Sequence, residues 1–102
     1  MEDLKKKIES IAKGNPIVIF MKGTPEAPRC GFSNRAVEIL KTLGKPIKAV
    51  DVLEDENLWD ALEKYTQWPT VPQIFINGEF VGGCDIITEF QERGELVKLV
   101  GE

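Results

Sequence analysis

Five consecutive apolar residues, Ile17 to Met21, follow directly after Pro16 and limit the folds open to this chain. The run is short and rich in β-branched side chains, so it predicts a strand that is buried on both faces. A second stretch of this kind, Ile47 to Val52, comes after a helical pattern of apolar residues. A strand, a helix and another strand of these lengths predict a right-handed, parallel βαβ unit.

Helical spacing of apolar residues predicts four helices in the chain. The first starts behind a cap at Asp3 and ends in a left-handed turn at Gly14. The second is terminated by Gly44, and the third ends near Thr66 because the prolines that follow favour extended backbone. The last has a break at Gly94. The residues that carry these patterns are Leu4, Ile8, Ile11 and Ala12, then Phe32, Ala36, Ile39, Leu40 and Leu43, then Leu58, Leu62 and Tyr65, then Ile86, Ile87, Phe90, Leu96, Val97 and Val100.

Two short strands, Gln73 to Ile76 and Glu79 to Val81, flank the pair Asn77-Gly78. This pair tolerates the positive φ angles of a type I′ turn, so the segment predicts an antiparallel hairpin. The resulting order, α-βαβ-α-ββ-α, describes an α/β fold with a four-stranded mixed sheet flanked by helices, and it resembles the thioredoxin fold. The 102 residues are enough for a single domain.

The composition limits the kinds of partner. The formal charge of −4 gives no field that would attract nucleic acid, and no apolar run is long enough to span a membrane. We therefore expect no nucleic-acid and no membrane partner, and a cytoplasmic location. The chain has two cysteines and no histidine, so these thiols are better interpreted as reactive or metal-binding groups than as a disulfide framework.

Cys30 is the main candidate for chemistry because it falls at the start of the second helix, in a loop that contains Pro28 and Gly31. Unpaired amides and the positive end of the helix dipole favour an anion there, and Lys22 and Arg29 add positive charge nearby. The sequence therefore predicts a thiol that ionises easily. The alternative is an inert, buried cysteine.

Four motifs in order carry a family resemblance. They are Lys22-Gly23-Thr24-Pro25, Cys30-Gly31-Phe32-Ser33, Trp68-Pro69-Thr70-Val71-Pro72-Gln73 and Gly82-Gly83-Cys84-Asp85. Together they resemble the monothiol glutaredoxins of the Cys-Gly-Phe-Ser type over nearly the whole chain. The resemblance implies a single glutaredoxin domain over residues 1–102.

The same resemblance implies a glutathione site. Cys30 would face the thiol of the tripeptide, and Lys22 would meet its glycine carboxylate. Val71 would offer backbone hydrogen bonds before a cis Pro72, a mode in which an extended peptide adds to strand backbone. The γ-glutamyl end would be bound by Cys84 and Asp85.

Each of these residues also has a plainer interpretation. Lys22 and Asp85 could be solvated surface charges, and Asp85 could simply cap a helix. Cys84 could be a packed small side chain, which we favour. Phe32 could fill the core, or it could shield a bound metal centre from water. Val71 and Pro72 could form an extended loop with a trans bond.

One position departs from the family pattern. Trp59 stands nine residues before Trp68, where the family often carries an arginine, so one cation for the glycine carboxylate is missing. Lys64 or Arg29 could replace the lost charge. The departure implies weaker glutathione binding.

Ser33 occupies the place of a resolving cysteine, which disfavours ordinary disulfide reduction. The first interpretation is therefore an iron–sulfur cluster carrier, and the alternative is a glutathione-dependent thiol-disulfide oxidoreductase that removes glutathione from mixed disulfides. A [2Fe–2S] cluster usually has four thiolate ligands, while Cys30 is the one thiolate ligand expected per chain. The resemblance implies that the cluster bridges a homodimer together with two glutathione molecules, and that the apo protein is a monomer. It also implies two kinds of protein partner, a BolA-type protein and apo iron–sulfur acceptor proteins.

Overall fold

A four-stranded mixed sheet forms the centre of the computed structural model, which describes residues 2–101. The strand order is β4-β1-β5-β6. The two strands of the βαβ unit, β1 and β4, pair in parallel, while β5 pairs antiparallel with both β1 and β6. The strands are β1 (Ile17–Met21), β4 (Ile47–Asp51), β5 (Gln73–Ile76) and β6 (Glu79–Gly82). This confirms the predicted thioredoxin fold.

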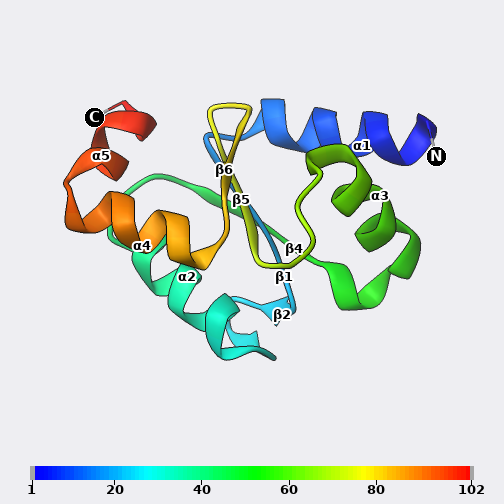
Figure 1. The fold of residues 1–102 in the computed structure, drawn as a ribbon, viewed down its shortest axis with the longest axis horizontal. Coiled ribbons are helices and arrows are strands. Elements are labelled where there is room, and N and C mark those ends of the chain that lie inside the picture. The colour runs from blue at the N-terminus through cyan, green and yellow to red at the C-terminus, as the bar shows by residue number, and fades with distance from the viewer. Residues whose placement is uncertain (1, 102) are drawn as a thin grey trace.

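Helices cover both faces of the sheet (Figure 1). On one side α1 (Glu2–Gly14) packs with α3 (Glu56–Thr66), and on the other α2 (Gly31–Lys41) packs with α4 (Cys84–Glu92), which in turn contacts α5 (Glu95–Val100). A 3-10 turn, η1 (Val52–Glu54), links β4 to α3. No helix among residues 2–101 is long and apolar enough to cross a membrane.

The core lies on both sides of β1, as its apolar run predicts. All five of its residues are fully buried. Because side chains alternate along a strand, Ile19 and Met21 pack with α2 and α4, while Val18 and Phe20 pack with α1 and α3. The central strand is therefore fixed from both faces, and the residues that follow it start from a rigid position.

The predicted hairpin is confirmed, with Asn77 and Gly78 both at positive φ. The end of the third helix at Thr66 and the break at Gly94 are confirmed as well. The second helix already ends at Lys41, and Gly44 follows with positive φ.

Three expectations were wrong in detail. The first helix starts at Glu2, so Asp3 lies inside its first turn, where an acidic side chain also favours the helix dipole. Gly14 is not left-handed, because the Asn15 side chain donates to the Ile11 carbonyl and completes the helix end. Val52 is the first residue of the 3-10 turn, and it is not the last residue of a strand.

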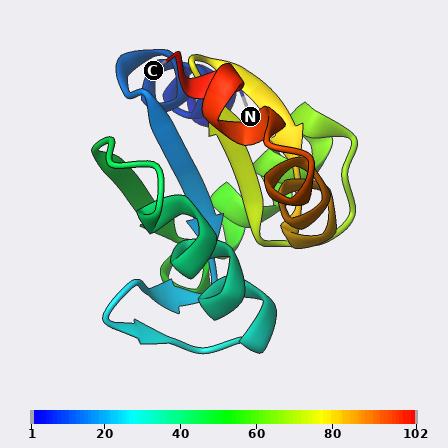
Figure 2. The ribbon, with the colours of Figure 1, turned by 90° about the vertical axis from the view of Figure 1, so that its left-hand side faces the viewer.

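The loop expected between β1 and α2 contains a small hairpin of its own. Its strands are β2 (Gly23–Thr24) and β3 (Ala27–Pro28), and it projects below the main sheet (Figure 2). The Thr24 hydroxyl accepts a hydrogen bond from the Ala27 N–H within this turn. The hairpin sets the path of the chain from Lys22 to the start of α2.

Candidate functional site

Cys30 is the N-cap residue of α2, as predicted. Its backbone is extended, with φ −152° and ψ 134°, and its carbonyl accepts from the Asn34 N–H at 3.0 Å, which is the first bond of the helix. Its thiol is partly exposed, whereas the other free cysteine, Cys84, is buried. The inert, buried alternative for Cys30 is therefore wrong.

The surroundings of Cys30 lower the pKa of its thiol. The backbone N–H of Ser33 contributes most, and slight burial acts in the opposite direction. The N–H of Phe32, the Ser33 hydroxyl and the charge of Lys22 lower the pKa further. The helix terminus therefore lowers the pKa mainly through the backbone amides of Ser33 and Phe32, as expected for an anion at an N-terminus, although the Cys30 side chain makes no cap hydrogen bond. Arg29 is not among the groups that lower this pKa.

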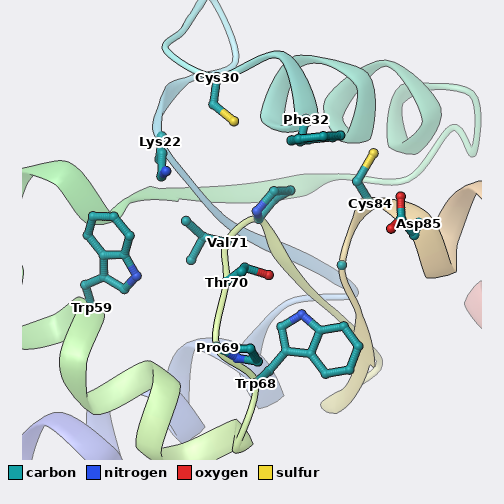
Figure 3. A pocket seen from close by; sticks show the side chains of 12 residues that line it. Lys22, Cys30, Phe32, Trp59, Trp68, Pro69, Thr70, Val71, Cys84 and Asp85 are labelled. Atoms are coloured by element: carbon teal, nitrogen blue, oxygen red, sulfur yellow. The ribbon is translucent and has the colours of Figure 1, made fainter.

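One groove of about 410 Å³ brings the predicted site residues together (Figure 3). The sulfur of Cys30 lies along its rim, and the α4 terminus lies across from it. The residues that line the groove are Lys22, Cys30, Phe32, Trp59, Trp68, Pro69, Thr70, Val71, Pro72, Gly83, Cys84 and Asp85. All seven residues proposed from the sequence are in this set.

Two opposite charges mark the ends of the groove. Lys22 follows β1, and Asp85 stands in the first turn of α4 on the other side (Figure 3). Between them lie the Cys30 thiol and the backbone of Val71. The Val71–Pro72 peptide bond is cis, as the family pattern implies. The arrangement suits an extended ligand with a negative group at one end and a positive group at the other.

The buried side chain of Gln73 holds the groove wall formed by residues 68–71. Its amide nitrogen donates to the carbonyls of Trp68 at 3.1 Å and Thr70 at 3.0 Å. Its oxygen accepts from the Thr66 hydroxyl at 2.9 Å. No strand ladder supports this segment. The Gln73 side chain, together with the Thr66 hydroxyl that accepts from the Trp68 N–H at 3.2 Å, provides hydrogen bonds that a regular element would otherwise supply.

Phe32 is 64% exposed, so its interpretation as core filling is wrong. Its ring lies beside the groove between Cys30 and Cys84 (Figure 3). Cys84 is 7% exposed and packs into the core cluster on the α2 side, which confirms the structural interpretation that we favoured. It also lines the groove, so packing and a place at the site coexist.

Trp59 lines the groove and makes a contact that the sequence did not predict. The Lys22 ammonium lies over its ring, 5.4 Å from the ring centroid. Neither Lys64 nor Arg29 lines the groove, so neither replaces the cation that the family pattern would supply. Sequence reasoning did not single out Trp68, Pro69 and Thr70 as site residues, although their position next to Val71 was a sufficient signal.

Soft metal ligands are few in the sequence, which has two cysteines and no histidine. Within residues 2–101 there is no group of three or more cysteine, aspartate, glutamate or histidine side chains that could hold a metal ion. The accessible thiol of Cys30 is a good ligand for a soft metal.

Comparison with known proteins identifies the family. The Glutaredoxin family model matches residues 17–81, which include β1, the Cys30 loop and the hairpin. The chain belongs to the glutaredoxin family. It is 47% identical over 100 residues to glutaredoxin 4 of Buchnera aphidicola, covering 98% of this chain and 93% of that one. It is 45% identical to the mitochondrial monothiol glutaredoxin-5 of Saccharomyces cerevisiae, covering 98% and 69%.

Solved glutaredoxin structures superpose closely on this glutaredoxin. Reduced poplar apo GrxS14 has a TM-score of 0.84 at 46% identity, covering 95% of this chain and 89% of that one. The holo form of glutaredoxin C1 from Populus has a TM-score of 0.86 at 34% identity, covering 97% and 87%. A buckwheat glutaredoxin–glutathione complex has a TM-score of 0.86 at 27% identity, covering 97% and 88%. The sequence resemblance to monothiol glutaredoxins is therefore confirmed.

Proposed function

We propose that this glutaredoxin binds glutathione in the groove beside Cys30 and uses it to carry a [2Fe–2S] cluster. The observation that carries the proposal is a partly exposed thiol with a lowered pKa, placed in a groove whose two ends carry Lys22 and Asp85. A thiolate is both a nucleophile and a metal ligand. The buckwheat relative, solved as a glutathione complex, supports the choice of ligand.

The tripeptide fits this groove in one direction. Its glycine carboxylate meets Lys22, its cysteine sulfur faces Cys30, and its γ-glutamyl ammonium meets Asp85 at the start of α4. Val71 lies two residues before the start of β5, so an extended peptide can continue the sheet there. The N-terminal amides of α4 suit the γ-glutamyl carboxylate beside Cys84.

The cluster is the cargo of this carrier and not a resident cofactor. Four thiolates are needed, and within the described chain the only accessible cysteine is Cys30. Two chains and two glutathione molecules supply four sulfurs across a two-fold axis, so the loaded form is a homodimer and the apo form a monomer. The exposed ring of Phe32 lies beside the thiol, where it excludes water from the bridging centre.

Half of the ligands in this arrangement are small molecules that exchange, so the cluster is easily released. This favours delivery over storage, with a role in cluster assembly and iron homeostasis. The partners are apo iron–sulfur acceptor proteins and, by family resemblance, a BolA-type protein. We assign residues 1–102 to one glutaredoxin domain in the cytoplasm; relatives with mitochondrial names occur as well.

Anaerobic reconstitution tests the carrier function. The protein is incubated with iron, sulfide and glutathione, and visible absorption is followed together with oligomeric state. We expect colour and dimer to appear together, to need glutathione, and to be lost in Cys30→Ser. Cys84→Ala is the matched control, because Cys84 is buried and we expect it to supply no ligand. Colour that survives in Cys30→Ser, or without glutathione, would contradict the bridging arrangement.

A second function, removal of glutathione from mixed disulfides, is favoured by the lowered pKa of the Cys30 thiol. The Cys30 thiolate would attack the glutathione sulfur, form a mixed disulfide and release the substrate thiolate, which takes up a proton. A second glutathione thiolate would then release oxidised glutathione and restore Cys30. Turnover by the colourless monomer that disappears in Cys30→Ala would support this function, and a rate equal to free glutathione would reject it.

A further inference from the structure

At one end of the groove, the cation Lys22 already contacts an aromatic ring of the protein. Among the described residues that line the groove, Lys22 is the only cation. Its ammonium is already in contact with the face of Trp59, at 5.4 Å from the ring centroid. The indole Nε1 of Trp59 donates to the Glu63 carboxylate at 3.2 Å, one turn further along α3, so a bond within the helix holds the ring in place. Lys22 therefore has a partner before any ligand binds.

This arrangement weakens the requirement for a carboxylate on the ligand. A site rejects an analogue strongly when the missing group leaves a buried polar partner unpaired. Lys22 is only half-buried and keeps its contact with Trp59 when no carboxylate is present. A single ion pair at a partly solvated position also contributes little by itself. The loss of the ligand carboxylate should therefore cost little affinity.

We propose that Trp59 determines ligand specificity by making the Lys22 end of the groove permissive. The groove then accepts γ-glutamyl-cysteinyl thiols whose third residue has no free carboxylate, in addition to glutathione. The inference rests on the glutathione site proposed above and names the class of ligands for that same site. A cation at position 59 would act in the opposite way, because it would repel Lys22 and make an anion between the two charges necessary.

A competition experiment measures this specificity directly. The reduced protein is equilibrated with the symmetric disulfides of glutathione and of glutathione capped as a glycine methylamide, in equal amounts. The Cys30 thiolate attacks one disulfide, forms a mixed disulfide and releases one thiolate, which takes up a proton. The two mixed disulfides differ in mass, so intact-protein mass spectrometry gives their ratio.

We expect the two mixed disulfides of the unaltered protein to differ by less than about threefold. Trp59→Arg should prefer glutathione by about tenfold more, because guanidinium and ammonium together require the carboxylate. Comparing ratios between variants cancels any intrinsic difference between the two thiols. The preference of Trp59→Arg should also fall with added salt.

Two further variants distinguish the effect of the Trp59 ring from the effect of an added charge elsewhere on α3. Trp59→Leu adds no charge but removes the partner of Lys22, so its preference for glutathione should rise about twofold to threefold above the unaltered protein. Asn57→Arg places the same added charge on an exposed position of α3 outside the groove lining, and its ratio should not change.

The inference is overturned if the unaltered protein excludes the methylamide as strongly as Trp59→Arg does, or if Trp59→Leu and the unaltered protein give the same ratio. The absence of both mixed disulfides would overturn the proposed glutathione site, and the inference with it. The presence of both, in the same ratio for the unaltered protein and for Trp59→Arg, would reject the inference alone.

Discussion

The Ser33 hydroxyl accepts a hydrogen bond from the backbone N–H of Lys22 at 3.2 Å. Ser33 is fully buried in the first turn of α2, and Lys22 follows directly after β1, so this bond joins the helix start to the sheet. Since the hydroxyl oxygen accepts from Lys22, its proton is free to be donated to the Cys30 sulfur. The serine that replaces a resolving cysteine thus supports the reactive thiol.

Replacement of Ser33 by alanine should raise the pKa of the Cys30 thiol. The substitution removes the hydroxyl contribution but leaves the Ser33 backbone amide, which has the larger effect, so the pKa should stay below that of an unperturbed thiol. The rate of alkylation of Cys30 by iodoacetamide against pH measures this, with the modified peptide identified by mass spectrometry. An unchanged profile would show that the hydroxyl does not act on the sulfur.

The same substitution should also lower the free energy of unfolding, by about 1–3 kcal/mol, because the Lys22 N–H loses its acceptor. Urea denaturation measures the loss. Thr42→Val is a suitable control, because Thr42 is exposed and does not join α2 to the sheet. Its hydroxyl donates to the Ile39 carbonyl at the end of α2 and accepts a long hydrogen bond from the Gln91 side chain. A loss no larger than that of the control would contradict the role of Ser33 in joining helix and sheet.

Stability should depend on pH through Cys30. The thiol pKa is lowered in the folded state, so between that value and the ordinary value of roughly 8.5 the unfolded chain binds more protons. The contribution is complete above the ordinary thiol pKa and is lost as pH falls through the lowered one. Under reducing conditions, the difference in unfolding free energy between the unaltered protein and Cys30→Ser should therefore increase with pH in this window. A difference that is flat or falls with pH would reject the lowered pKa.

Gln73→Glu should destabilise the groove wall by about 2–4 kcal/mol. A carboxylate cannot donate, so the carbonyls of Trp68 and Thr70 lose their partner and face a buried negative charge. Thr66→Val is the comparison variant. It removes the hydrogen bonds of the Thr66 hydroxyl to the Gln73 oxygen, to the Leu62 carbonyl and from the Trp68 N–H, but it buries no charge and leaves the Gln73 amide nitrogen in place. Urea denaturation and glutathione binding should both be affected more strongly by Gln73→Glu than by Thr66→Val.

Replacement by alanine should change stability in opposite directions at two glycines beside the site. Gly23 has φ +90°, and an added Cβ would lie 2.6 Å from the Ala27 carbonyl oxygen, so Gly23→Ala should cost at least about 2 kcal/mol. Gly31 has negative φ and open space around it, so Gly31→Ala should stabilise by about 0.4–1 kcal/mol. Thermal denaturation of the two variants checks the contrast, and equal effects would contradict it.

Local patterns in the sequence determined most of this fold. The apolar run Ile17 to Met21, the Asn77-Gly78 turn and the prolines after Thr66 each act on their own neighbours, so strand, hairpin and helix end could be predicted without tertiary contacts. The position of Cys30 at a helix start depends on the same local signals. This is why the candidate thiol and its lowered pKa could be predicted from the sequence.

Only the tertiary structure decided how the groove is held and how its charges are arranged. The contact of Lys22 with Trp59 joins the end of β1 to α3, and no spacing in the sequence indicates it. The bond between Ser33 and the Lys22 amide and the support of the wall by Gln73 depend on where the elements pack. Such contacts arise between segments that only the packed sheet brings together, and propensity and periodicity carry no information about them.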